Sequence, residues 1–176
     1  MLTQSETVSD LPSIQLDGDA IRQLLPHRDV MALLDRIHDY HPESRTIVAL
    51  KQVPMNEFSI QSFGPDLLYF PPTLLTECLA QTSGIMMNME GLQRLGVELR
   101  NLPDPTYRQT IPDVPLSVLA ESHIKHESFA RPGDSIYLHS KVAMQRAEFR
   151  YFHVSARTTD RELAKGTILL SYPSYM

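Results

Sequence analysis

A change in hydrophobic periodicity near residue 115 constrains the fold of this chain more than any other feature. Between residues 73 and 95, apolar or small side chains recur at helical spacing and form one stripe. The members of this stripe are Leu74, Leu75, Cys78, Leu79, Thr82, Ile85, Met86 and Met89. After residue 115 the pattern alternates, and four segments are typical of strands, namely 116–126, 135–145, 148–158 and 162–172. A long helix followed by a run of strands predicts an α+β domain in which the helix packs on an antiparallel sheet.

Shorter elements are predicted before the long helix. Residues 17–25 are typical of a short helix that ends at Pro26, and residues 45–53 alternate as a strand does. Residues 1–13 are polar and acidic, so we expect a flexible tail followed by a single domain over 14–176.

Loops and turns are indicated by proline and glycine. Weak periodicity with several prolines predicts a loop at 57–72 and a long irregular excursion at 97–115. The sequences RPGD at 131–134 and TTDR at 158–161 predict turns between the strands.

Composition excludes several classes of function. The chain has 176 residues, enough for one domain with a sizeable core, and a net charge of −5 with its 16 Lys and Arg scattered. This argues against nucleic acid or an anionic membrane as the main partner. No apolar run is long enough for a membrane span and no signal peptide is evident, so we expect a cytoplasmic protein. The single cysteine excludes an internal disulfide, and the seven histidines lack metal-ligand spacing, so we expect no metal and no cofactor.

Two stretches of sequence carry a family resemblance. Residues 24–37 read LLPHRDVMALLDRI, and residues 56–84 read NEFSIQSFGPDLLYFPPTLLTECLAQTSG. Together they resemble the 3-hydroxyacyl-acyl carrier protein dehydratases of bacterial fatty-acid synthesis. That resemblance implies the hot-dog fold, in which a sheet wraps one long helix and two chains build each active site. It further implies a tunnel for an acyl thioester at the dimer interface, with acyl carrier protein or coenzyme A as the carrier.

The resemblance also assigns residues, because residues 56–84 align with the family pattern without a gap. The family's catalytic glutamate falls on Glu77, and its glutamine falls on Gln81, one helical turn later. Its Met-Pro-Gly falls on Phe70-Pro71-Pro72, and its catalytic histidine falls on Phe63. We expect the tunnel to be lined by Phe63, Tyr69, Phe70, Glu77 and Gln81.

Two of these positions depart from the chemistry of the family. A phenyl ring at Phe63 transfers no proton, and a general acid–base group contributes roughly 10²–10⁴ in rate. Proline at Pro72 has no N–H to donate to the thioester oxygen, and one such donor is worth about 10²–10³ in rate. Glu77 therefore retains its place while two other parts of the machinery are missing. Burial is the expected means of tuning the pKa of Glu77.

Four functions remain open at this stage. The first is a dehydratase-like subunit with little activity alone, which completes its site in a heteromer with a histidine-bearing relative. The second is a hot-dog thioesterase in which Glu77 activates water or attacks the thioester. The third is a dehydratase that uses another histidine, with His123, His126 and His139 as candidates. The fourth is a non-enzymatic binder of acyl thioesters.

The PHRD sequence at 26–29 is interpreted as structural, because the family uses this stretch mainly to anchor its sheet to the helix. No catalytic role is assigned to His27 or Arg28. Cys78 is expected to be a buried core residue.

Overall fold

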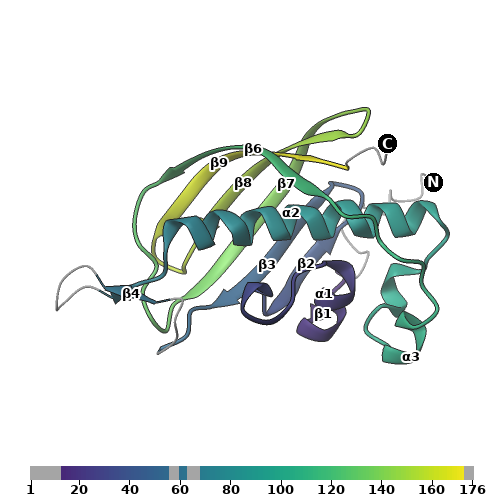
Figure 1. Cartoon of the computed structure of the whole chain (residues 1–176), viewed down its shortest axis with the longest axis horizontal. Helices are drawn as coiled ribbons and strands as arrows, with labels where there is room; N and C mark the ends of the chain where they lie inside the picture. The colour runs from purple at the N-terminus through teal and green to yellow at the C-terminus, as the bar shows by residue number, and fades with distance from the viewer. Residues whose placement is uncertain (1–12, 56–59, 63–67, 173–176) are drawn as a thin grey trace, which may run out of the picture.

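The computed structural model describes residues 13–55, 60–62 and 68–172. Within them the chain forms a long helix with a curved antiparallel sheet wrapped around it (Figure 1). The helices are α1 (Gly18–Leu24), α2 (Pro72–Arg94) and α3 (Pro105–Arg108), with two 3-10 turns, η1 (Asp29–Met31) and η2 (Leu99–Asn101). The strands are β1 (Leu16–Asp17), β2 (Arg36–His41), β3 (Thr46–Gln52), β4 (Gln61–Ser62), β5 (Leu68–Tyr69), β6 (Val118–His126), β7 (Ser135–Arg146), β8 (Phe149–Arg157) and β9 (Glu162–Ser171).

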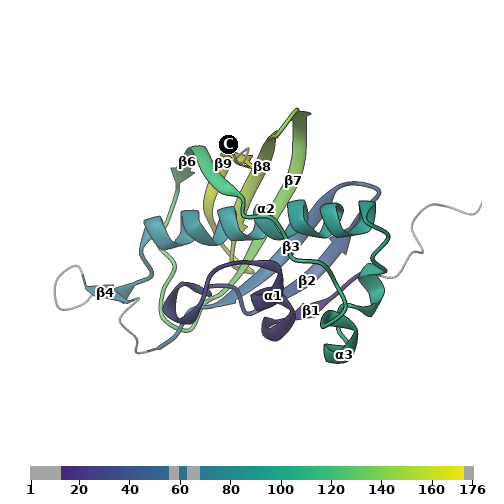
Figure 2. The ribbon, with the colours of Figure 1, turned by 45° about the vertical axis from the view of Figure 1, so that its right-hand side comes forward.

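The main sheet has seven strands in the order β1-β2-β3-β7-β8-β9-β6, and every pairing is antiparallel. Strand β6 comes after α2 in sequence but lies at the far edge, and among the described strands it pairs only with β9. Figure 2 shows the sheet curving around α2, which confirms the expected helix-on-sheet architecture. The helix begins one residue earlier than predicted, at Pro72, where the missing N–H of proline costs no helical hydrogen bond.

Helix α2 is buried on almost every side, because the sheet covers one face and α1 lies beside another. Its predicted apolar stripe supplies core residues such as Leu75, Ile85 and Met86. Ser83 donates to the carbonyl of Leu79 and lies 2.8 Å from the hydroxyl of Ser140 on β7, so polar groups under the sheet are also paired. The helix is therefore the centre of the hydrophobic core.

Glycine is required where β6 and β9 approach each other. Gly166 on β9 is in register with Ile124 on β6. A Cβ atom added at Gly166 would lie 1.9 Å from the backbone oxygen of His123, well inside van der Waals contact. No larger residue fits there without a shift of the backbone.

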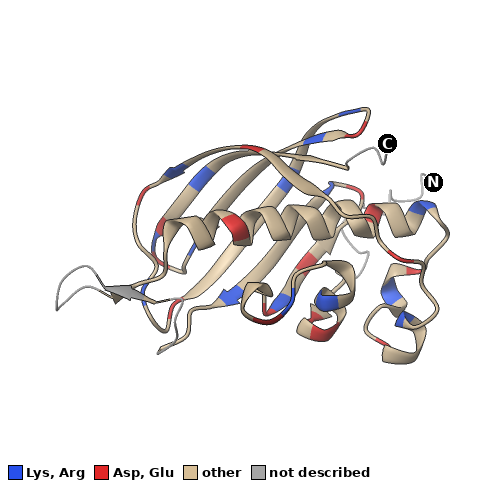
Figure 3. Cartoon of the chain, viewed as in Figure 1, with Lys and Arg blue, Asp and Glu red and all other residues tan. Residues whose placement is uncertain are grey.

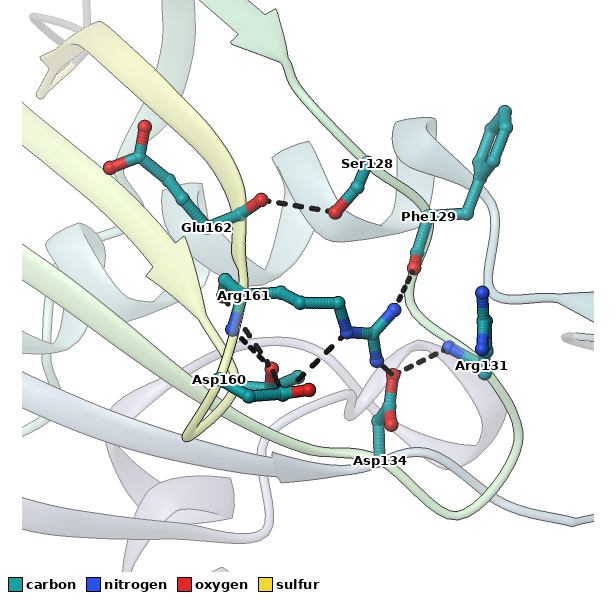
Figure 4. Close-up of polar contacts among 8 residues, drawn as sticks. Ser128, Phe129, Arg131, Asp134, Asp160, Arg161 and Glu162 are labelled. Carbon is teal, nitrogen blue, oxygen red and sulfur yellow. Dashed lines mark hydrogen bonds and ion pairs between the residues drawn. The ribbon is translucent and has the colours of Figure 1, made fainter.

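Both predicted turns are present, and they are tied together. The turn at 131–134 contains Gly133 at φ +86°, and Asp134 accepts a hydrogen bond from the backbone N–H of Arg131. Arg161, in the turn between β8 and β9, donates to the Asp134 carboxylate at 2.7 Å and to the carbonyl of Phe129 at 3.2 Å (Figure 4). This cluster holds the loop between β6 and β7.

Two predicted loops contain regular structure. Within 57–72 the described residues include β4 and β5, which pair with each other, and the first residue of α2. The excursion at 97–115 contains η2 and α3, and the Asp104 side chain caps α3 by accepting from the N–H of Thr106. Pattern alone missed these elements because they are too short to show periodicity. Strand β2 was also not predicted, since its polar sequence RIHDYH alternates weakly.

Candidate functional site

The candidate site lies on the N-terminal half of α2, where Glu77 is the one charged residue. The charged residues of α2 are Glu77, Glu90 and Arg94, and the helix is mainly tan in the charge view of Figure 3. Glu90 is neutralised at the other end by Arg45 and Arg150, at 2.8 and 2.7 Å. Glu77 is therefore the carboxylate of this helix that has no arginine or lysine among its ion-pair partners in the described chain.

Gln81 connects Glu77 to the segment that precedes β2. Its amide nitrogen donates to Glu77 Oε1 at 3.0 Å and to the Met31 carbonyl at 2.8 Å. Its amide oxygen accepts from the backbone N–H of Leu33 at 3.2 Å. The side chain is almost fully buried, so these hydrogen bonds satisfy a polar group that would otherwise be costly. The predicted contact between Glu77 and Gln81 is present.

The second partner of Glu77 is His27, to which the sequence interpretation assigned no role. His27 Nε2 lies 3.2 Å from Glu77 Oε1. Residues on both sides of PHRD are hydrogen-bonded to the helix, as expected for an anchoring segment, and the segment also places this imidazole beside the carboxylate. Sequence spacing could not reveal the contact because the two residues lie in different elements and meet through the fold. The signal that was available is the presence of histidine inside the resembling segment.

The two partners determine the charge state of Glu77. Burial raises the pKa of Glu77, but hydrogen bonds from His27 and Gln81, together with the charge of His27, outweigh burial and hold that pKa below its ordinary value. Burial does act on this pKa, as expected, and is the largest single influence, but the net shift is downward. Glu77 is thus a carboxylate at neutral pH, the form that can accept a proton.

The aromatic residues expected around the site take different positions. Tyr69, on β5, is half-buried, with its ring centroid 4.9 Å from that of Phe129. Phe70 is buried in the core, and its N–H donates to the carbonyl of Ala130 at 2.8 Å. Pro72 is the first residue of α2. Phe63 lies outside the described residues.

The three histidines named as alternatives do not contact Glu77 through any described ion pair or hydrogen bond. His126 Nε2 is 3.3 Å from the hydroxyl of Thr76, beside Glu77 on α2, and burial lowers the pKa of His126. His123 pairs with Glu121 on exposed β6. His139 alternates on β7 with Leu138 and Ser140, which face the core, so it points to the opposite face of the sheet. Of these three, only His126 is close to the site.

Other site classes find no support among the described residues. None of their His, Cys, Asp and Glu side chains gather in a group of three or more that could hold a metal ion. None of their helices is long and apolar enough to cross a membrane. Cys78 is fully buried, and burial raises the pKa of its thiol, so it is a core residue as expected.

Comparison with known proteins supports both the fold and the resemblance. A stretch of 72 residues is 44% identical to the 3-hydroxyacyl-[acyl-carrier-protein] dehydratase FabZ of Francisella tularensis subsp. novicida, and to the same protein of F. tularensis subsp. tularensis. The match spans 41% of this chain and less than half, 44%, of those relatives. No protein-family model matches the chain.

Solved structures extend the comparison to most of the chain. The dehydratase heterocomplex ApeI:P from Xenorhabdus doucetiae matches with a TM-score of 0.66 at 16% identity, over 88% of this chain and 91% of that one. The PaaI protein of the E. coli phenylacetic acid degradation operon matches with a TM-score of 0.55 at 8% identity, over 88% of each chain. At such low identity these likenesses concern the fold alone. The chain therefore has the hot-dog fold, and part of its sequence is similar to the FabZ dehydratases.

Proposed function

We propose that this chain binds 3-hydroxyacyl thioesters, carried by acyl carrier protein or coenzyme A, and takes part in their dehydration in fatty-acid or polyketide-type biosynthesis. The observation that carries the proposal is the environment of Glu77. It is a half-buried carboxylate on the central helix, paired with an imidazole and an amide, at the position where the resembling family has its catalytic glutamate. The partial identity to FabZ dehydratases supports the same class of reaction.

The isolated chain is expected to be slow, and a heteromer is its proposed working form. Phe63 transfers no proton, and Pro72 offers no N–H at the first position of α2. In the resembling family the histidine comes from the opposite protomer, so a histidine-bearing relative could complete the site around Glu77. The fold similarity to a dehydratase heterocomplex is consistent with such an assembly.

Thioester hydrolysis is the second candidate, and the ionised state of Glu77 is the observation that supports it. An ionised carboxylate is the state that activates a water molecule for attack on a thioester. The missing N–H at Pro72 counts against this reaction as well, because the tetrahedral intermediate also carries a negative oxygen.

The test uses 3-hydroxyacyl thioesters with the wild type, the Glu77→Ala variant and the double variant Phe63→His with Pro72→Gly. We expect slow turnover by the wild type alone, faster turnover when a histidine-bearing relative is added, and loss of both with Glu77→Ala. The double variant should gain activity alone. Hydrolysis lost with Glu77→Ala, without dehydration, would replace the first candidate by the second. If Glu77→Ala changes neither reaction, the enzymatic proposal is wrong and thioester binding is the function that remains.

A further inference from the structure

The segment 24–33 is hydrogen-bonded to α2 on both sides of His27. On one side, Asn88 donates from its amide nitrogen to the Leu24 carbonyl at 2.6 Å. On the other, Gln81 holds the Met31 carbonyl at 2.8 Å and the Leu33 N–H at 3.2 Å. Asn88 and Gln81 are both buried on the helix. The backbone therefore holds His27 near Glu77 independently of any attraction between their side chains.

The orientation of the imidazole is unusual for a structural histidine. Its Nε2 lies 3.2 Å from Glu77 Oε1, while its Nδ1 is buried with no hydrogen-bond partner among the described residues. Buried polar atoms in folded proteins are nearly always paired, and an exception calls for an explanation. Here the polar contacts of the ring are directed toward one carboxylate.

The pair is also partly accessible to solvent, although it borders the core. The side chains of His27 and Glu77 are 30% and 26% exposed. Their neighbours Leu75, Cys78 and Gln81 are buried. A molecule that approaches this part of α2 therefore meets an imidazole and a carboxylate together, within one proton-transfer distance of each other.

We propose that His27 is the second proton-transfer group of the site and acts in the same chain as Glu77. This inference rests on the proposed function and deepens it, because it supplies from within the chain the histidine that Phe63 replaces. The opposite protomer then contributes the walls of the acyl tunnel, and a histidine-bearing relative adds a further imidazole to the site.

Glu77 and His27 together can accept and donate the two protons that move in a dehydration. With Glu77 ionised and His27 protonated, Glu77 accepts the proton from C2 of a 3-hydroxyacyl thioester. The electron pair of that C–H bond forms the C2–C3 double bond, and the C3–O bond breaks. The departing hydroxyl takes the Nε2 proton of His27 and leaves as water. The proton on Glu77 then returns to Nε2 along the contact, which restores the starting state without an outside donor.

The experiment compares His27→Gln with His27→Phe. Glutamine keeps an N–H that can donate to Glu77 but transfers no proton, whereas phenylalanine removes both properties. His41→Gln is the matched control, since His41 also pairs with a carboxylate, that of Asp39 on β2, without contacting Glu77. Rates are measured with 3-hydroxybutyryl-CoA and with a 3-hydroxydecanoyl thioester of acyl carrier protein, for the chain alone and mixed with a histidine-bearing relative. Thermal midpoint and thioester affinity are measured for every variant.

We expect both His27 variants to lose about 100-fold or more in kcat, with the affinity and thermal midpoint of His27→Gln unchanged. His41→Gln should match the wild type. Combining His27→Gln with Glu77→Gln should cost no more than either change alone, because groups that act as a unit are not additive.

Two results would overturn the inference. If His27→Gln retains kcat within a few-fold of the wild type while His27→Phe does not, His27 only positions Glu77. If both His27 variants keep the wild-type kcat while Glu77→Ala loses it, His27 transfers no proton. Failure of the proposed function looks different, because then no thioester binds or Glu77→Ala leaves turnover unchanged.

Discussion

At the scale of single residues, the pKa of Glu77 makes stability depend on pH. Its folded-state pKa lies below the ordinary value of 4.5, because hydrogen bonds from His27 and Gln81 outweigh burial. A depressed carboxylate pKa contributes stability that is present above the unfolded value and is lost as pH falls through the folded value.

The prediction compares the free energy of unfolding of the wild type with that of Glu77→Gln. We expect the wild type to be more stable by a larger margin at pH 7 than well below pH 4.5. Urea unfolding of both proteins at each pH measures the two differences. A difference that stays constant between the two conditions would contradict the hydrogen-bonded pair at this position.

A second residue-scale prediction concerns Cys78. Its thiol is fully buried in α2, and burial raises its pKa. Because the thiolate is the reactive form, we expect no reaction with a thiol-specific disulfide reagent under native conditions. Reaction in urea should follow global unfolding. Rapid labelling of the native protein would show that the helix face carrying Cys78 opens more readily than its burial implies.

At the scale of elements, replacement by alanine is expected to have opposite effects on stability at two glycines. Gly166→Ala drives a methyl group into the backbone of β6, and overpacking of this kind costs about 1–3 kcal/mol in stability. Gly91 on α2 has no atom within 4 Å of an added Cβ. Gly91→Ala should therefore stabilise the protein by roughly 0.5–1 kcal/mol through helix propensity. Chemical denaturation measures the change in stability of each variant. If both variants were stabilised, the close approach of β6 and β9 would be contradicted.

Some of these elements and contacts could be predicted from the sequence, and others could not. The four strands after residue 115 and the helix at α2 follow from periodicity, because each is long enough to bury one face repeatedly. Glu77 and Gln81 follow from the resemblance. The pairing of His27 with Glu77 does not, because it depends on how segment 24–33 lies across α2. A local pattern contains no information on that crossing.

At the scale of the whole molecule, a buried ion network joins three separate parts of the fold. Glu90, at the C-terminal end of α2, accepts from Arg45 in the β2–β3 turn and from Arg150 on β8. Removing one partner of a buried network leaves uncompensated charge, so Glu90→Ala should cost about 3–5 kcal/mol. Glu98→Ala, which breaks the exposed pair with Arg100, is the control and should stay within about 0.5 kcal/mol. Thermal and urea unfolding measure the stability lost in each variant. If Glu90→Ala lost no more stability than Glu98→Ala, the network would not stabilise the fold.

The exposed edge of the sheet predicts the state of assembly. Strand β6 is paired on one side only, and Val118 and Leu119 are exposed on it. An open edge of this length favours pairing with a second chain. We expect a dimer, or a multiple of dimers, of the 20.0 kDa chain or of this chain with a relative. Light scattering that shows a stable monomer on dilution, with and without a relative, would count against both forms.

The order of strands has a consequence for how the chain is made. Strand β6 is synthesised after α2 and α3, yet among the described strands it pairs only with β9, the last of them. Until β9 has been synthesised, the helix lacks part of its cover, and β6 has no neighbour within its own chain. Contacts between segments so far apart form slowly, because the intervening loop must be closed first. The nascent protein thus passes through a period in which its longest helix and an unpaired strand are exposed together, and a partner subunit already present at that time would find β6 free.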